Sequence, residues 1–220
     1  MLNINIDIIG MPGCQYFIAN TFAHLLGGLL VTGISTENPI INNIEKKPLS
    51  HLTMIIMTFF LLFSVISVKK GPLKYILFIL FCITIGQMIS GFVKRLQLED
   101  VLSNTLITVG AIFFSMTAIA LFDKGNMLGW EAYLFAGLLG LILASIATMF
   151  MSKETKEANN IPTWISRFVV LLFTLYIGFD VEVMKVNATL CKSNPDYINE
   201  SINLYLDIIN LFSGVGGLND

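Results

Sequence analysis

The sequence predicts an all-α membrane protein, a bundle of seven transmembrane helices in which the seventh is short and central. Of its 220 residues, 55% are hydrophobic and only 13% are charged, with a mean hydropathy of +0.77. A soluble domain carries about 25% charged residues, so this chain has too few to cover a water-facing surface. We therefore expect the lipid bilayer to be its main partner.

The hydrophobic residues gather in runs of the length that a helix needs to cross the hydrocarbon core, about 20 residues. Charged residues with Pro, Gly or Asn fill the short breaks between the runs, as is typical of turns at headgroup level. The first five breaks read TENPIINNIEKKPLS, KKGP, KRLQLED, DKGN and SKETKEANNIP. These boundaries predict one domain, residues 1–220, with spans at about 16–35, 52–68, 73–93, 101–122, 127–151, 164–183 and 201–218.

The charges and cysteines exclude several classes of protein. The net charge is −2 and no basic patch is present, so no nucleic-acid partner is expected. Lys and Arg fall almost equally on both sides of the expected bundle, which leaves its orientation open. Cys14, Cys82 and Cys191 form no CxxC pair, so neither a zinc site nor a disulfide framework is expected. The sequons at Asn187 and Asn199 could be glycosylated only if their loop faces a lumen.

Small and polar residues within the spans predict which helix faces point inward, because membrane helices associate through such residues. Gln87 lies on a polar face of the third span. His24 is the one titratable group inside the first span; a hydrogen bond to a neighbouring helix explains it more simply than a proton relay. The inward faces of the fourth and fifth spans are predicted at Asn104, Thr108, Ala111, Ser115 and Ala118, and at Ala136, Gly140 and Ala144.

Two aspartates lie where charges are costly, because Asp at the centre of a spanning helix costs ~3 kcal/mol on insertion scales. Asp180 follows Arg167 by thirteen residues, which is about 20 Å along a helix. Asp207 is the only charge in SINLYLDIINLFSGVGG and shares a helix face with Asn203 and Asn210. A polar stripe on an apolar helix should face the interior of the bundle.

If the sixth and seventh spans are neighbours, Asp180 and Asp207 can meet in the interior. Two carboxylates this close in a low dielectric cannot both ionise, so they are expected to share one proton and to act as a pH switch. When ionised, the pair offers oxygens that suit a hard cation such as Ca²⁺, bound transiently and not at a fixed metal site. The alternative is that Asp180 lies near the membrane interface, solvated together with Glu182.

Four segments carry a family resemblance. SINLYLDIINLF closely resembles the signature near the C-terminus of the transmembrane Bax inhibitor motif family, and YIGFDVEVM resembles the sixth span of that family. TFAHLLGGLLVTGIS resembles its first span and YLFAGLLGLILASIATMF its fifth. The resemblance therefore covers nearly the whole chain, in order.

The resemblance implies a seven-helix bundle, a pH-sensitive calcium leak, and paired aspartates that match Asp180 and Asp207. In eukaryotic members it implies suppression of cell death from endoplasmic reticulum or Golgi membranes, together with other membrane proteins of the apoptosis machinery. A viral chain would share that location, and a bacterial one would lie in the plasma membrane. Phe179 stands where the family usually has Tyr. Lys69 and Lys70 are candidates for a basic partner, since the second span has no arginine.

These observations leave three functional hypotheses. The first is a pH-gated Ca²⁺ leak, with Ca²⁺ as the transported ion and no cofactor. The second is an interaction protein that suppresses cell death without ion flux. The third is an intramembrane aspartyl protease, but that chemistry goes with Gly-x-Gly-Asp, whereas Leu204, Tyr205 and Leu206 precede Asp207. We therefore do not expect an enzyme.

Overall fold

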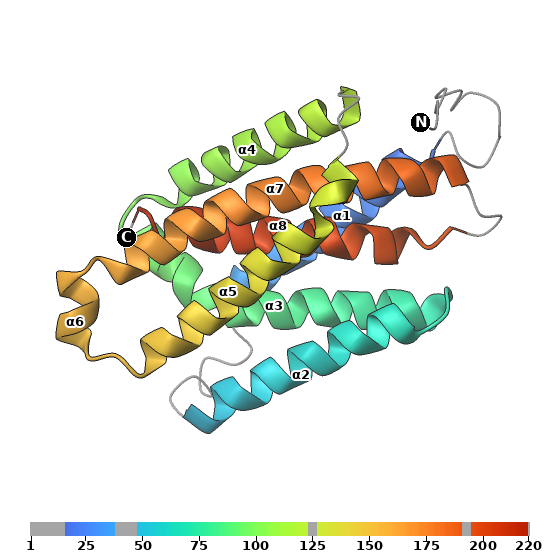
Figure 1. Ribbon diagram of the computed structural model, residues 1–220. Helices are drawn as coiled ribbons and strands as arrows, with labels where there is room; N and C mark the ends of the chain where they lie inside the picture. The colour runs from blue at the N-terminus through green and yellow to red at the C-terminus, as the bar shows by residue number, and fades with distance from the viewer. Residues whose placement is uncertain (1–15, 38–47, 123–126, 191–194, 220) are drawn as a thin grey trace. The chain divides into compact units, whose positions relative to one another are not determined.

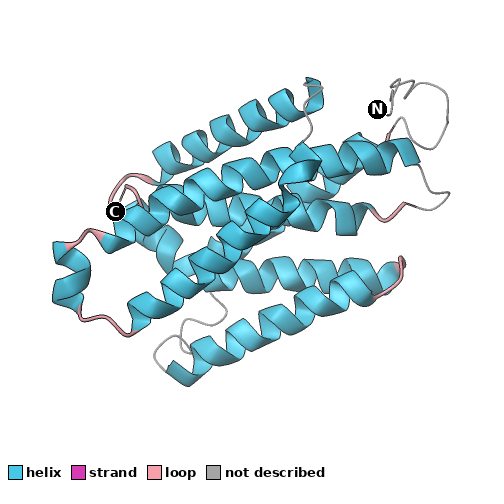
Figure 2. Cartoon of the chain, in the orientation of Figure 1, coloured by secondary structure: helices cyan, strands magenta, loops and turns pink. Residues whose placement is uncertain are grey.

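A computed structural model describes residues 16–37, 48–122, 127–190 and 195–219 (Figure 1). Helices make up nearly all of this part of the chain, and no strand occurs within it (Figure 2), which confirms the all-α class. The elements are α1 (Phe17–Glu37), α2 (Pro48–Ser67), α3 (Pro72–Leu98), α4 (Leu102–Phe122), the 3₁₀ helix η1 (Met127–Trp130), α5 (Glu131–Met149), α6 (Lys153–Ala158), α7 (Ile161–Leu190) and α8 (Tyr197–Gly216).

Four of the described helical segments are long and apolar enough to cross a membrane: α1, α3, α4 and η1 together with α5. Their bounds lie within a few residues of the predicted spans. The second predicted span corresponds to α2, whose apolar part, Thr53–Ser67, is shorter. The sixth and seventh correspond to α7 and α8, which are more polar, so the count of seven spans stays a prediction.

The break between the fifth and sixth predicted spans contains a helix that the hydropathy pattern missed. In α6, the side chain of Ser152 accepts a hydrogen bond from the backbone N–H of Thr155 at 3.3 Å. Serine in this position caps a helix start by satisfying a free N–H group. Asn160 then turns the chain into α7 with a φ of 49°, a left-handed conformation that asparagine tolerates better than most residues.

Helix α7 continues to Leu190, beyond the predicted end at Val183. The prediction ended this span where hydropathy falls, at Lys185 and Asn187. Lys185 Nζ instead donates a hydrogen bond to the carbonyl oxygen of Ala120 at 2.7 Å, near the end of α4. The last carbonyls of a helix lack hydrogen-bond partners within that helix. Lys185 of α7 satisfies one of the last carbonyls of α4, and this contact keeps the polar turn of α7 helical.

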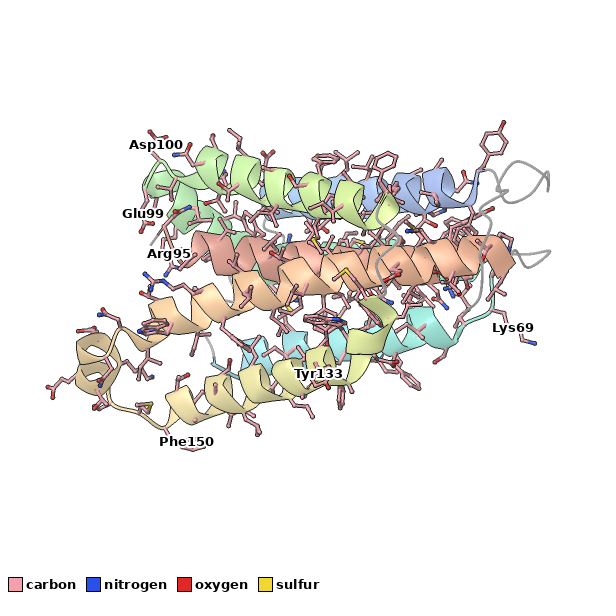
Figure 3. All side chains as sticks on the ribbon, turned by 45° about the horizontal axis from the view of Figure 1, so that its top comes forward. Lys69, Arg95, Glu99, Asp100, Tyr133 and Phe150 are labelled. Atoms are coloured by element: carbon pink, nitrogen blue, oxygen red, sulfur yellow. The ribbon has the colours of Figure 1, made fainter. Side chains whose placement is uncertain are left out.

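Charged side chains gather at the two ends of α3, with an apolar stretch between them. Lys69 lies at the turn before this helix, while Arg95, Glu99 and Asp100 lie at its other end (Figure 3). The helix has 27 residues, a length of about 40 Å, which reaches from one headgroup region to the other. This distribution of charge agrees with a helix that spans the bilayer.

The contacts divide the described chain into two compact units. The first contains α1, α2, α3 and α8 as far as Tyr205, and in it α3 packs against both α1 and α2 (Figure 1). The second contains α4 to α7 and the remainder of α8 from Leu206, and in it α7 packs against α4 and α5.

In the first unit, α1 and α3 approach most closely at Gly86. A Cβ atom at this position would lie 2.5 Å from the carbonyl oxygen of Thr32 and 2.7 Å from Cβ of Ser35. The neighbouring Gln87 donates hydrogen bonds from Nε2 to the carbonyl oxygen and the Oγ of Ser35, at 2.5 and 2.9 Å. Ser35 Oγ also bonds to the carbonyl oxygen of Ile83 at 3.0 Å. Glycine is therefore required here for the two backbones to meet.

We expect Gly86→Ala to destabilise the protein, because α1 and α3 must separate and overpacking typically costs about 1–3 kcal/mol. The matched control is Gly33→Ala in α1, where nothing lies within 4 Å of an added Cβ. Both changes gain up to about 1 kcal/mol of helix propensity, so the difference between them isolates the steric cost. Unfolding of the detergent-solubilised protein measures both. Equal stability of the two variants would contradict the close approach.

Tyr205 of α8 closes the core of the same unit and is fully buried. Its hydroxyl lies 2.6 Å from Oγ1 of Thr32, and its ring packs against Phe78 and Phe81, with ring centroids 6.4 and 5.7 Å away. Thr32 Oγ1 also donates toward the carbonyl oxygen of Cys82 at 3.2 Å. Three helices are thus joined around one phenol group, with the fully buried Cys82 beside it.

In the second unit, the structure contradicts the predicted inward faces of the fourth and fifth spans. Helix α5 meets α7 at Gly137, where an added Cβ would lie 2.9 Å from Cδ1 of Leu172. The predicted faces are wrong, because all their residues are exposed: Asn104, Thr108, Ala111, Ser115 and Ala118 in α4, and Ala136, Gly140 and Ala144 in α5. The buried residues are Thr105, Val109, Phe113, Thr117 and Ala120 in α4, and Leu134 and Leu141 in α5.

Candidate functional site

The carboxyl groups of Asp180 in α7 and Asp207 in α8 lie together in the second unit. Their side chains lie within electrostatic and hydrogen-bonding range of each other. Asp207 is only 4% exposed, and Asp180 is half-buried. The structure thus brings together the two residues that the sequence analysis singled out.

This geometry has a direct chemical consequence. An ionised carboxylate only accepts hydrogen bonds, so two carboxyl groups bond to each other only when one of them carries a proton. Two negative charges this close, with little water to separate them, also repel strongly. Asp180 and Asp207 therefore form a pair that can hold one proton between them.

Two features of the surroundings of the aspartate pair bear on what the pair can bind. Tyr176, one helical turn before Asp180, lies within electrostatic range of both carboxyl groups. Oδ2 of Asp207 is buried without a hydrogen-bond partner in the described part of the chain. A buried polar atom of this kind calls for a proton, a water or an ion.

Across the described ranges, no third His, Cys, Asp or Glu joins the two carboxyl groups to form a metal cluster. A resident Ca²⁺ takes 6–8 oxygen ligands, whereas two carboxylates supply at most four. The pair alone therefore supplies fewer oxygens than a resident Ca²⁺ takes.

The four polar residues expected to support the aspartate pair lie in different surroundings; they are Asn203, Asn210, Gln87 and His24. Asn210 donates from Nδ2 to the carbonyl oxygen of Leu206 at 2.8 Å, whereas Asn203 is exposed. Gln87 binds Ser35 in the first unit, as described above. His24, also in that unit, donates from Nδ1 to the carbonyl oxygen of Asn20 at 2.7 Å, within its own helix, where a bond to a neighbouring helix was expected.

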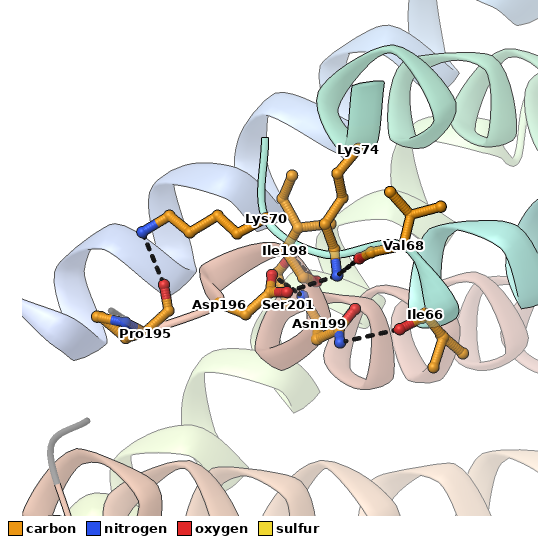
Figure 4. A network of polar contacts seen from close by, with 9 residues as sticks. All are labelled: Ile66, Val68, Lys70, Lys74, Pro195, Asp196, Ile198, Asn199 and Ser201. Carbon is orange, nitrogen blue, oxygen red and sulfur yellow. Dashed lines mark hydrogen bonds and ion pairs between the residues drawn. The ribbon is translucent and has the colours of Figure 1, made fainter. Parts of the chain in front are cut away.

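The two candidate basic partners lie at the turn between α2 and α3. Lys69 is exposed and points away from the helices (Figure 3). Lys70 Nζ donates to the carbonyl oxygen of Pro195 at 2.9 Å (Figure 4). The same Nζ lies 5.1 Å from the ring centroid of Tyr197. Both contacts are at the start of α8, whereas Asp207 lies ten residues further along that helix, about 15 Å away. A pairing of either lysine with the aspartates stays a prediction.

A buried ion pair that the sequence analysis missed lies near this turn. Lys74 in α3 is 0% exposed; its Nζ lies 2.5 Å from Oδ2 of Asp196 and donates to the carbonyl oxygen of Val68 at 3.1 Å (Figure 4). Asp196 Oδ1 accepts from the backbone N–H of Asn199 at 3.2 Å, so the same side chain caps the start of α8. Asn199 Nδ2 bonds to the carbonyl oxygen of Ile66 at 3.4 Å. These contacts fasten the turn between α2 and α3 to α8.

The apolar helices and the buried carboxyl pair together define an integral, multi-pass membrane protein with an ionisable site inside it. A family model described as inhibitor of apoptosis-promoting Bax1 matches residues 14–215, and the chain belongs to this family, Bax1-I. This result confirms the resemblance found in the LYLDIINLF segment.

Three relatives illustrate the range of the family. An uncharacterized protein of Borreliella burgdorferi is 26% identical over 213 residues, 89% of this chain and 88% of that protein. The Golgi anti-apoptotic protein of vaccinia virus (strain Lister) is 31% identical over 144 residues, 65% of this chain and 56% of the viral protein. Protein lifeguard 4 of Mus musculus is 31% identical over 139 residues, 62% of this chain and 54% of the mouse protein. The matches thus cover little more than half of the viral and mouse proteins.

Proposed function

We propose that this protein is a pH-sensitive Ca²⁺ leak channel of an intracellular membrane, and that it restrains cell death. One observation carries the channel part of the proposal: the carboxyl of Asp207, buried in α8, lies within hydrogen-bonding range of that of Asp180 in α7. Such a contact depends on a proton, so it responds to pH without any cofactor.

The direction of the response follows from the charges. At low pH the shared proton joins α7 to α8 through the two carboxyl groups, and the path is closed. As the pH rises, the proton leaves and two negative charges face each other in a poorly hydrated site. Their repulsion separates the side chains, and their oxygens then attract a hard cation such as Ca²⁺. The leak therefore increases with pH.

The name of one relative supports the cell-death part of the proposal. The vaccinia relative is a Golgi anti-apoptotic protein, which favours a Golgi membrane and a role against apoptosis for this chain. In such a role the protein would act with other membrane proteins of the apoptosis machinery.

The channel proposal is tested by reconstituting the full chain into liposomes loaded with Ca²⁺ and a fluorescent indicator. We expect the rate of Ca²⁺ release to rise as the pH is stepped upward, above the rate in protein-free liposomes. Release that does not differ from protein-free liposomes, or that is the same at every pH, would overturn the proposal.

The second candidate is an interaction protein that suppresses cell death without conducting ions, and the name of the vaccinia relative is compatible with it. The channel and the interaction protein are separated by measuring the survival of cells that express either the wild type or a variant without Ca²⁺ flux. We expect protection to be lost together with flux. Full protection without flux would favour the second candidate. No site residue suggests catalysis, and we retain the expectation that the protein is not an enzyme.

A further inference from the structure

An apolar groove lies between α1 and α3 in the first unit. Its volume is about 310 Å³, and apolar atoms form nearly all of its surface. Its walls include Gly27 and Val31 of α1, and Tyr75, Phe78 and Ile79 of α3. This volume is at the lower end of the range of small-molecule sites, about 300–1,000 Å³.

Two consecutive glycines in α1 create the groove. An added Cβ at Gly28 would lie 2.8 Å from Cζ of Phe78, so the two helices touch there and form the floor. An added Cβ at Gly27 would have nothing within 4 Å, so the groove is open on that side. Both helices are apolar enough to span the membrane, and Leu26 and Leu30, which neighbour groove residues along α1, are exposed. The opening therefore faces hydrocarbon.

One end of the groove carries aromatic rings and a cation. His24, in the groove wall, stacks on Tyr197 with ring centroids 5.8 Å apart, and it lies 5.7 Å from the ring of Tyr75. The ammonium group of Lys70 lies on Tyr197. Tyrosine and lysine are typical of the headgroup region. From Tyr75 the groove runs along α3 to Cys82, about 10 Å toward the hydrocarbon core.

We propose that this groove binds one acyl chain of an anionic phospholipid, with the headgroup at Lys70. An acyl chain is narrow and apolar and enters from the hydrocarbon layer, as the opening requires. It is also joined to a phosphate, which complements the cation at the polar end. An ammonium group has three donors, so Lys70 can bind the phosphate and still donate to Pro195.

The test uses the full chain in liposomes that contain phosphatidylglycerol with a photoactivatable diazirine in its acyl chain. Peptide mass spectrometry then maps the adducts. The Gly27→Phe variant is designed to fill the groove, and because nothing lies within 4 Å of an added Cβ at Gly27, we expect the variant to fold. The matched control is Gly33→Phe, which has equally open surroundings on the same helix but lies outside the groove. We expect adducts within 23–31 and 75–82 in the wild type and the control, and their loss in Gly27→Phe.

The identity of the headgroup is tested by competition. Unlabelled phosphatidylglycerol should displace the photoactivatable lipid better than phosphatidylcholine, and Lys70→Gln should remove this preference. Equal competition by both lipids would overturn the proposal that the headgroup is anionic. Adducts spread evenly over the exposed helix faces, unchanged by Gly27→Phe, would overturn the groove as a lipid site. A change of oligomeric state in Gly27→Phe would assign the groove to a contact with a second copy of the chain, and would equally overturn the proposal.

Discussion

Replacement of Asp207 by Asn is expected to abolish the pH dependence of Ca²⁺ release from liposomes. The amide has nearly the shape of the carboxyl and can still donate a hydrogen bond to Asp180, but it cannot give up a proton in the accessible pH range. The contact between α7 and α8 then no longer senses pH, so the release rate should be low and the same at each pH. Asp180→Asn should have the same effect, because the proton belongs to the pair.

The control for these variants is Glu182→Gln. Glu182 also lies in α7, but its side chain accepts a hydrogen bond from the backbone N–H of Met127 and lies outside the pair. Glutamine retains an acceptor oxygen, so Glu182→Gln should keep the pH response of the wild type. If Asp207→Asn also keeps it, the shared proton is not the switch.

The second large effect concerns stability: Asp196→Asn should destabilise the first unit more than Lys74→Met does. Removing Asp196 leaves the ammonium of Lys74, which is fully buried, with only the Val68 carbonyl among its described partners. Breaking a buried ion pair in this way typically costs about 3–5 kcal/mol. Lys74→Met instead leaves a carboxylate whose side chain is 29% exposed, so water can solvate it.

The double variant Lys74→Met with Asp196→Asn provides the control. It leaves no unpaired charge, so its stability should exceed that of Asp196→Asn alone. Free energies of unfolding from denaturant titration in detergent at neutral pH give all three values. If the two single changes cost the same and their effects add in the double variant, the contact has no energetic role.

The helices could be predicted from the sequence because the need to fill the hydrocarbon layer produces runs of fixed length. The helix faces that point inward could not be predicted from the sequence. Lipid tails are as apolar as a protein core, so hydropathy does not separate a helix face that meets lipid from one that meets another helix. For this reason Thr108 and Ser115 were expected inside α4, whereas Val109 and Phe113 are the residues buried there.

The residues of the candidate site could be predicted from the sequence, but the buried ion pair between Lys74 and Asp196 could not. Asp180 and Asp207 were predicted because a charge within a span is costly and calls for a partner. Lys74 gave no such signal, since a lysine three residues into α3 resembles one whose ammonium reaches the headgroup region. Its partner, Asp196, precedes α8 and could have been assigned as a helix cap from its position. That the two residues meet depends on the packing of α3 against α8, which no local pattern contains.

The position of Cys82 supplies the protein with an internal reporter. Cys82 is 0% exposed at the inner end of the groove, where α1, α3 and Tyr205 of α8 come together, so we expect a bulky maleimide to react with it mainly when these helices separate. With Cys14 and Cys191 replaced by Ser, the labelling rate in native membranes should be slow, and Gly86→Ala should increase it. Such a rate measures local opening of the first unit, a quantity that a global unfolding curve averages away.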